Sequence, residues 1–147
     1  MPFYLADSSI WIGRRRPDAA YLQQLFIWRF ERGQLAACIP VALEVLVSPR
    51  DGAAYEADWE ALWAPLRWLP LRERATWRAL EVQRELASTT AGAHRRRPID
   101  YLVAACAEDA GEEVVLWHWD AELTAICEHT GQSHEPEHER ASQHGLD

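Results

Sequence analysis

Short apolar runs and helical repeats alternate along the chain. Three apolar runs predict buried strands over 3–5, 35–39 and 114–117. Apolar residues three or four positions apart predict helices between and after these strands, with stops at Gly33, Pro65, Gly92 and Gly111. The order strand, helix, strand, several helices, strand and helix predicts an α/β fold, a three-layer α/β/α sandwich with a central, mainly parallel sheet.

The length and the end of the chain set the expected domain organisation. The 147 residues suffice for one domain, which is predicted over 1–131. From Gln132 onward the chain is polar and rich in His and Glu, so 132–147 is predicted to be a disordered tail that cannot bury a core. No apolar run approaches the ~20 residues of a membrane span, and the N-terminus lacks the apolar block of a signal peptide. A cytoplasmic protein without a membrane partner is expected.

Composition narrows the possible chemistry. All 15 basic residues are Arg, so a phosphate-binding loop ending in Gly-Lys and a Schiff-base lysine are excluded. The net charge of -8 argues against a general affinity of the whole surface for nucleic acid. Local clusters of Arg therefore matter more for nucleic-acid binding than the net charge does. Cys38, Cys106 and Cys127 have apolar neighbours and no paired spacing, which predicts reduced core residues.

Two acids follow predicted strands. Asp7 comes directly after the first strand, and Asp120 comes shortly after the strand over 114–117. In a parallel sheet, ligands bind beyond the carboxyl ends of the strands, so both acids are expected at the reactive edge. Asp7 or Ser8 also suits the N-cap of the helix that follows, and the residue types alone do not separate the two interpretations.

Two further acids lie near the starts of helices. Pro40 and Pro98 each suit a first helical turn, which places Glu44 about one turn into its helix and Asp100 beside free backbone amides. Glu44 is either on the exposed stripe of its helix or turned into a site. Asp100 is either a carboxylate that complements the helix dipole or a functional group.

The predicted topology brings these four acids to one edge of the sheet. Carboxylates that lie close together raise one another's pKa and destabilise the fold unless a cation compensates them. Mg²⁺ takes hard oxygen ligands and keeps waters that phosphate oxygens can replace. The acidic set therefore predicts metal-assisted hydrolysis of phosphodiesters.

The segments around these acids resemble those of PIN-domain nucleases, and more narrowly the VapC toxins of bacterial toxin–antitoxin pairs. The resemblance spans about residues 3–127 and is carried in the family's order by 4–9, 39–46, 98–105 and 116–126. It implies a ribonuclease that uses Mg²⁺ or Mn²⁺, with Asp7 and Asp100 as principal ligands, Glu44 and Asp120 completing the set and Ser9 hydrogen-bonding within it. Glu122 stands where the family usually has a second Asp, which puts its role as a ligand in question.

The resemblance also implies partners. They are an RNA substrate, a VapB-like antitoxin that presents an Arg to the acids, and a second copy of the chain in a homodimer. RNA contacts are assigned to two clusters, Arg14, Arg15 and Arg16 and Arg95, Arg96 and Arg97, although solvated loops would have the same composition. The alternative function is a PIN-like scaffold that binds a partner or RNA without cutting it, and retention of all four acids argues against it.

Overall fold

The computed structural model describes residues 1–137 and contains one sheet of parallel strands. The strands are β1 (Phe3–Ala6), β2 (Leu35–Ala37), β3 (Arg67–Trp68), β4 (Val114–His118) and β5 (His134–Pro136). Their order across the sheet is β3-β2-β1-β4-β5, and every pairing is parallel. The predicted α/β class with a mainly parallel sheet is confirmed.

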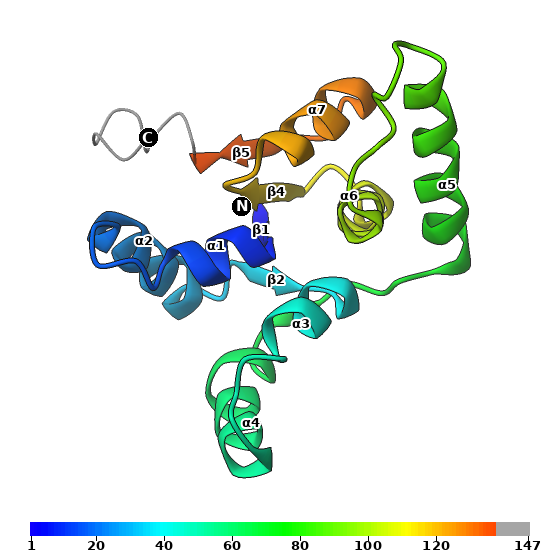
Figure 1. Cartoon of the computed structure of the whole chain (residues 1–147). Coiled ribbons are helices and arrows are strands. Elements are labelled where there is room, and N and C mark those ends of the chain that lie inside the picture. The colour runs from blue at the N-terminus through cyan, green and yellow to red at the C-terminus, as the bar shows by residue number, and fades with distance from the viewer. Residues whose placement is uncertain (138–147) are drawn as a thin grey trace.

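Helices cover both faces of this sheet. They are α1 (Ser8–Gly13), α2 (Ala20–Glu31), α3 (Ile39–Val45), α4 (Gly52–Asp58), the π-helical turn η1 (Trp59–Trp63), α5 (Glu73–Ala87), α6 (Pro98–Ala110) and α7 (Ala121–Thr130). Figure 1 shows α2 on one side of the strands and α6 on the other, with α5 outermost beyond α6. The first strand is therefore central in two directions, between β2 and β4 within the sheet and between two helical layers.

Large apolar side chains fill the space between these layers. Leu5 and Leu116 are fully buried on neighbouring strands and are aligned with each other in the register. Trp11 and Trp63 stack with ring centroids 4.0 Å apart, which fixes α1 against the turn η1. Part of the tryptophan content is thus ordinary core packing, while Trp77 stays 64% exposed on α5.

The middle of the chain differs from the prediction in two places. Helix α5 ends at Ala87 and not near residue 91, because the hydroxyls of Ser88 and Thr89 bond back to carbonyls of the last turn, at 2.9 and 2.7 Å. A strand not predicted, β3, pairs with Ala36 and Ala37 of β2. It has two residues between prolines, too few to give an alternating pattern.

The prediction that residues 132–147 form a disordered tail is wrong for its first part. Residues 134–136 form β5, which pairs with Leu116, Trp117 and His118 of β4. Backbone hydrogen bonds and two side-chain interactions, rather than apolar burial, hold this strand. The guanidinium of Arg29 binds the Glu135 carboxylate at 2.6 and 3.1 Å, and the Trp117 indole N–H donates to Glu137 at 2.7 Å. The remainder of the predicted tail, 138–147, lies outside the described residues.

Among the described residues, no helix combines the length and the apolar character that a membrane crossing requires. All three cysteines are buried and free, which confirms the prediction of reduced core residues.

Candidate active site

Asp7 serves both as a helix cap and as a member of an acidic cluster. Its backbone N–H donates to Trp117 O at 2.9 Å, so the residue is held where β1 and β4 end together. One carboxylate oxygen, Oδ2, accepts from the N–H and the hydroxyl of Ser9, at 3.1 and 2.8 Å. The other, Oδ1, is buried and has no hydrogen-bond partner among residues 1–137. The two interpretations left open by the sequence therefore apply to different oxygens of one side chain.

Asp100 lies in the first turn of α6 and is 1% exposed. Helix α6 packs on β4, α3 and α5, and this packing turns its N-terminal end toward the sheet edge. Within the described chain neither carboxylate oxygen of Asp100 makes a hydrogen bond, and the nearest cation is the Arg97 guanidinium, 3.9 Å away. A surface carboxylate that only complements a helix dipole would be hydrated, so burial favours the functional interpretation.

Glu44 is turned into the site. The exposed stripe of α3 is formed by Ile39 and Leu43, at 49 and 64% exposure, and Val47 beyond the helix is 80% exposed, whereas the Glu44 side chain is 22% exposed. Its carboxylate accepts from the Ser8 hydroxyl at 3.2 Å and forms an ion pair with Arg97. The alternative placement of Glu44 on the solvent stripe is thereby excluded.

These three acids form one cluster. One carboxylate oxygen each from Asp7, Glu44 and Asp100 lies within 4.8 Å of the others. The pKa of Asp100 is raised to about 7, mainly by burial; Arg97 lowers it, and the charges of Asp120, Asp7 and Glu44 raise it. Burial likewise raises the pKa of Asp7, against the hydrogen bonds from Ser8 and Ser9. Neither carboxylate is fully compensated by the protein itself.

The donor set fits a hard divalent cation. Three unpaired buried oxygens, Asp7 Oδ1 and both oxygens of Asp100, have lost water without gaining a donor. A cation such as Mg²⁺ or Mn²⁺ prefers carboxylate oxygens and would satisfy all three. The residues present therefore fit a metal centre made of Asp7, Asp100 and Glu44.

The remaining two predicted acids lie outside this cluster. Asp120 is the N-cap of α7, and its Oδ1 accepts from Glu122 N at 2.8 Å. It is close enough to raise the pKa of Asp100 but does not belong to the group within 4.8 Å. Glu122 is exposed and forms an ion pair with Arg96. The structure thus brings together three of the five predicted acids and leaves two at the rim.

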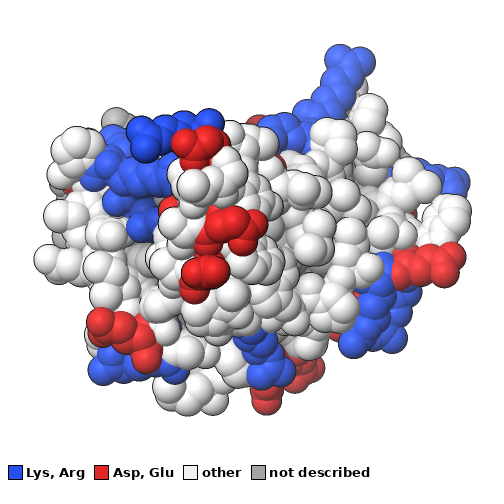
Figure 2. Space-filling view, turned by 90° about the horizontal axis from the view of Figure 1, so that it is seen from below, with Lys and Arg blue, Asp and Glu red and all other residues white. Residues whose placement is uncertain are grey.

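The two Arg clusters are divided by their contacts. Arg14 lies over the Phe26 ring at 4.5 Å and donates to Gln23, and Arg96 donates to Ala93 O and pairs with Glu122. Arg15 and Arg95 are exposed. Figure 2 shows several separate basic patches on the face that it displays, some of them in contact with acidic groups, rather than one basic area that covers the face.

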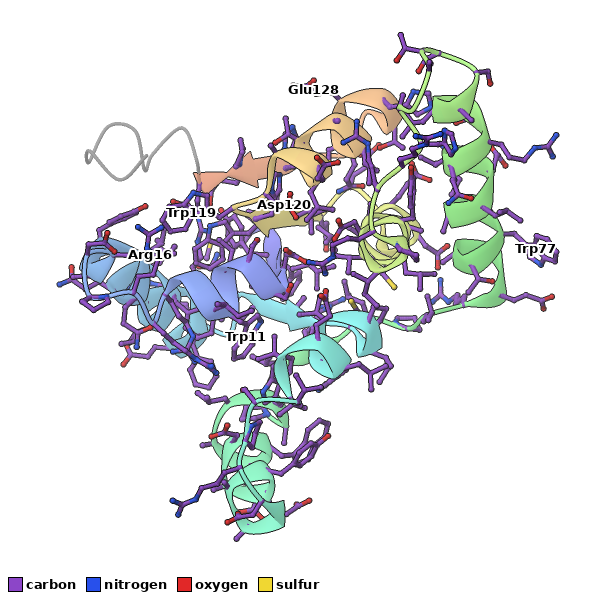
Figure 3. All side chains as sticks on the ribbon, viewed as in Figure 1. Trp11, Arg16, Trp77, Trp119, Asp120 and Glu128 are labelled. Carbon is purple, nitrogen blue, oxygen red and sulfur yellow. The ribbon has the colours of Figure 1, made fainter. Side chains whose placement is uncertain are left out.

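A hollow beside the acids contains a residue that the sequence did not single out. It is lined by Ser8, Ser9, Ile12, Gly13, Arg16, Arg97, Trp119 and Asp120. The backbone N–H of Trp119 donates to the Ser9 hydroxyl at 2.8 Å. The Trp119 ring packs so closely on α1 that a Cβ at Gly13 would lie 2.9 Å from the ring. In Figure 3, Arg16 and Trp119 lie beside each other near the start of α7, and the guanidinium stands 4.9 Å from the ring centroid. The sequence feature that could have pointed to this residue is Gly13, because the Trp119 ring occupies the space that a side chain at position 13 would need.

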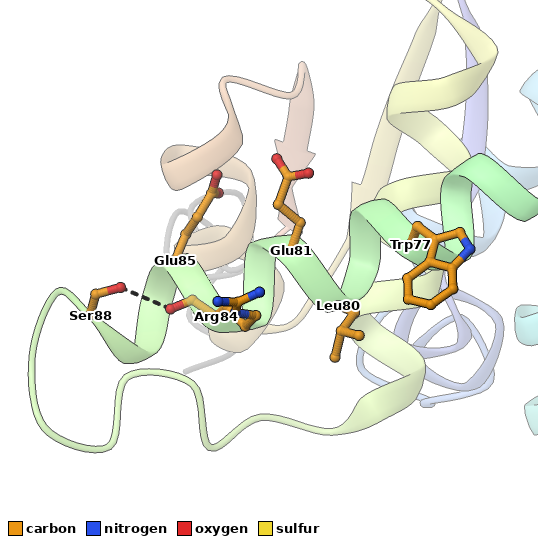
Figure 4. Close-up of a pocket in the computed structure, with 6 residues that line it drawn as sticks. All are labelled: Trp77, Leu80, Glu81, Arg84, Glu85 and Ser88. Carbon is orange, nitrogen blue, oxygen red and sulfur yellow. Dashed lines mark hydrogen bonds between the residues drawn. The ribbon is translucent and has the colours of Figure 1, made fainter.

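Another pocket lies along α5, away from these acids. It is lined by Trp77, Leu80, Glu81, Arg84, Glu85 and Ser88, which share one face of that helix (Figure 4). None of the five predicted acids lines it, so we place the chemistry at the sheet edge and not in this pocket.

Comparison with known proteins gives matches of three kinds. The family model described as PIN domain matches residues 4–128. Ribonuclease VapC18 of Mycobacterium tuberculosis (strain ATCC 25618 / H37Rv) is 32% identical over 131 residues, which cover 88% of this chain and 90% of that protein. The structure described as DNA bound VapBC from Salmonella typhimurium matches with a TM-score of 0.68 at 17% identity, over 92% of this chain and 98% of its counterpart.

Proposed function

Because the chain belongs to the PIN domain family, we propose that it is a metal-dependent endoribonuclease and the toxin of a toxin–antitoxin pair. One observation carries the proposal within the site. Asp7 and Asp100 are each 1% exposed, yet three of their four carboxylate oxygens have no hydrogen-bond partner in the part of the chain that the structure describes. A purely structural role does not account for buried acids that lack partners, whereas cation binding does.

Each residue of the cluster has a distinct part in this proposal. Asp7, Asp100 and Glu44 hold Mg²⁺ or Mn²⁺. When bound there, the cation would supply an activated water and neutralise charge on the phosphate. Ser9 fixes Asp7 through two hydrogen bonds to Oδ2 and so keeps Oδ1 aimed into the site. Asp120 completes the acidic set from the rim.

The hollow beside the acids is the proposed path of the RNA. Arg16 in the loop after α1 and Arg97 directly before α6 line it and supply positive charge for phosphates, although each is also paired with an acid, Asp18 and Glu44 respectively. Trp119 offers an apolar ring at its side. Arg15 and Arg95 are exposed and extend this charge, whereas Arg14 and Arg96 do not line the hollow and bond to Gln23 and Glu122. We assign RNA contacts to the first four and structural roles to the last two.

Arg97 also supports the proposal of an antitoxin partner. It pairs with Glu44 and lies 3.9 Å from Asp100, which shows that a guanidinium fits among these acids. An Arg presented by a VapB-like antitoxin would meet the same acids from outside, and the relative described as VapBC is itself a complex. A homodimer and a cytoplasmic location, where the RNA substrate is found, belong to the same proposal.

The test is Asp7→Asn. Asn is as good an N-cap as Asp, so the substitution keeps α1 and removes only the charge. Millimolar Mg²⁺ is expected to raise the Tm of the wild type and hardly affect the variant, because a ligand of the folded state adds RT ln(1 + [L]/Kd). The rate of RNA cleavage is expected to fall at least about 100-fold, because losing the cation removes several kcal/mol of charge stabilisation in the transition state.

Asp51→Asn is the matched control. Asp51 caps α4 in the same way, through a bond from Ala54 N at 2.8 Å, but lies outside the cluster. It should respond to Mg²⁺ and cleave RNA like the wild type. Full cleavage by Asp7→Asn, or equal Mg²⁺ responses in Asp7→Asn and the wild type, would favour a scaffold that binds without cutting.

A further inference from the structure

A second group of metal-type ligands lies at the other side of β4. His118 ends β4, Cys127 lies in α7 and His134 begins β5. His118 and Cys127 are 0 and 1% exposed, and His134 is half-buried. One ligand atom from each lies within 4.8 Å of the other two. Three different elements thus bring two imidazoles and a thiol together.

The two imidazoles face each other through their nitrogens. His118 Nε2 and His134 Nδ1 are 3.0 Å apart, and the rings are parallel within 8° with centroids 5.3 Å apart. Since a ring nitrogen lies about 1.1 Å from its centroid, the two rings are nearly coplanar and meet at their edges. Nδ1 of His118 accepts from Asp120 N at 3.3 Å, so the proton of this neutral ring is on Nε2 and is donated to His134.

The thiol faces this pair from α7. The pKa of Cys127 is raised to about 12, mainly by burial and also by the charges of Asp7 and Glu128. The sulfur is therefore a neutral thiol at physiological pH when no cation is near it. A cation bound to both imidazoles would supply the positive charge that stabilises the thiolate.

We propose that His118, Cys127 and His134 form a site for a borderline-soft transition metal ion of the Zn²⁺ class. Imidazole nitrogen and thiolate sulfur are the donors that such ions select, and the carboxylate cluster beyond β1 offers only oxygen. Three protein ligands leave the fourth tetrahedral position to water. The proposal does not depend on nuclease activity.

Metal binding requires a local rearrangement of the three side chains, in which the sulfur must come from within 4.8 Å of the nitrogens to about 3.6 Å. Bonds of about 2.05 Å to nitrogen and 2.3 Å to sulfur place tetrahedral ligand atoms about 3.3–3.6 Å apart. The nitrogens must separate by about 0.3 Å from their present 3.0 Å, and the rings must turn out of their common plane. Binding releases the proton of the Cys127 thiol and moves the His118 proton from Nε2 to Nδ1. The bond from Asp120 N, which is long at 3.3 Å, is the one given up.

Cobalt is the probe that separates this site from the acidic cluster. Co²⁺ added to the full-length protein is expected to give a thiolate-to-cobalt charge-transfer band in the near ultraviolet, with one equivalent of Zn²⁺ abolishing it and raising the Tm. Cys127→Ser should remove the band. Asp7→Asn should keep the band, because a carboxylate site gives no such transition. Cys106→Ser, which replaces a buried thiol on α6, should keep the band as well.

A second variant covers the case in which Cys127→Ser fails to fold. His134→Gln changes a half-buried side chain and leaves the backbone pairing of β5, and it should weaken Co²⁺ binding at least tenfold with an unchanged circular dichroism spectrum. A triple variant of Gln132→Ala, His138→Gln and His144→Gln, which spares the three ligands, should retain the band. Absence of the band in the wild type, or a band of normal affinity in either Cys127→Ser or His134→Gln, would overturn the proposal.

Discussion

Buried and half-buried acids lie in two regions of this molecule, and their surroundings differ. Asp7 and Asp100 meet beyond the end of β1, where three of their carboxylate oxygens have no partner among the described residues. Glu135 and Glu137 belong to the segment that forms and follows β5. The first binds the Arg29 guanidinium at 2.6 and 3.1 Å, and the second accepts from the Trp117 indole at 2.7 Å.

This difference separates functional acids from structural acids better than burial does. Glu137 is 0% exposed and Asp7 and Asp100 are 1% exposed, so the exposed fraction does not distinguish them. Arg29 and Trp117 donate to Glu135 and Glu137, which offsets the cost of removing these charges from water, whereas Asp100 has no donor among the described residues and Asp7 has donors, from Ser9, at only one oxygen. Substitution should therefore lower stability in the segment around β5 and raise it in the acidic cluster.

Arg29→Met is expected to have the largest effect on stability. The substitution removes the donor of Glu135 and a cation that lies 3.6 Å from the Tyr4 ring centroid, so the free energy of unfolding should fall by about 2 kcal/mol. This is less than the ~3–5 kcal/mol for breaking a fully buried ion pair, because the Glu135 side chain is 28% exposed. Urea denaturation measures this change. Arg32→Met, at an exposed position on the same helix end, should change stability by less than about 0.5 kcal/mol. Equal losses would show that β5 is held by something other than Arg29.

Asp100→Asn is expected to act in the opposite direction and to depend on pH. A carboxyl with a folded pKa of about 7 and an unfolded pKa near 3.9 favours the folded state below pH 4 and loses that advantage as the pH rises to 7. With a chelator present, the variant should exceed the wild type by more than about 1 kcal/mol above pH 7 and by progressively less toward pH 4.

Thermal melts of both proteins across that pH range provide the measurement. Glu137→Gln, which weakens the acceptor of the Trp117 hydrogen bond, is the control of opposite sign and should be less stable than the wild type. A constant difference between Asp100→Asn and the wild type from pH 4 to 8 would mean that Asp100 is solvated in the folded protein.

The smallest effect is expected at the rim of the site. Asp120→Asn should lower the rate of RNA cleavage about fivefold, on the order of 1 kcal/mol, because Asn keeps the cap of α7 but lacks the charge beside Asp100. Glu122→Gln should change the rate less than twofold, since Glu122 is exposed and paired with Arg96. Single-turnover cleavage at saturating Mg²⁺ compares them, and a larger loss at Glu122 would move the outer ligand to that position.

The sequence predicted the acidic cluster because its placement follows from local rules. Asp7 directly follows a short apolar strand, and Pro98 places Asp100 in a first helical turn. The orientation of Glu44 was not predictable, because it depends on which face of α3 meets α1 and α6. The separation of Asp120 from the other three acids was not predictable either, because it amounts to only a few ångströms.

The C-terminal strand was missed because its stability comes from distant partners. His134, Glu135 and Pro136 carry no apolar pattern, and their neighbours on β4 lie about twenty positions earlier. A signal existed at Arg29, which continues the spacing of Leu22 and Phe26 along the buried face of α2. A basic residue on an apolar helix face requires an acidic partner, and Glu135 is that partner.

The position of β1 determines when the protein becomes active during its synthesis. Phe3 pairs with Val114, so one edge of the central strand has no neighbour until most of the chain has been translated. Pairing over such a separation is slow, because loop closure precedes the contacts that offset it. Asp7 and Asp100 therefore meet late, after α6 and β4 have docked. A ribosome making this chain therefore carries no assembled acidic cluster until β4 has been synthesised.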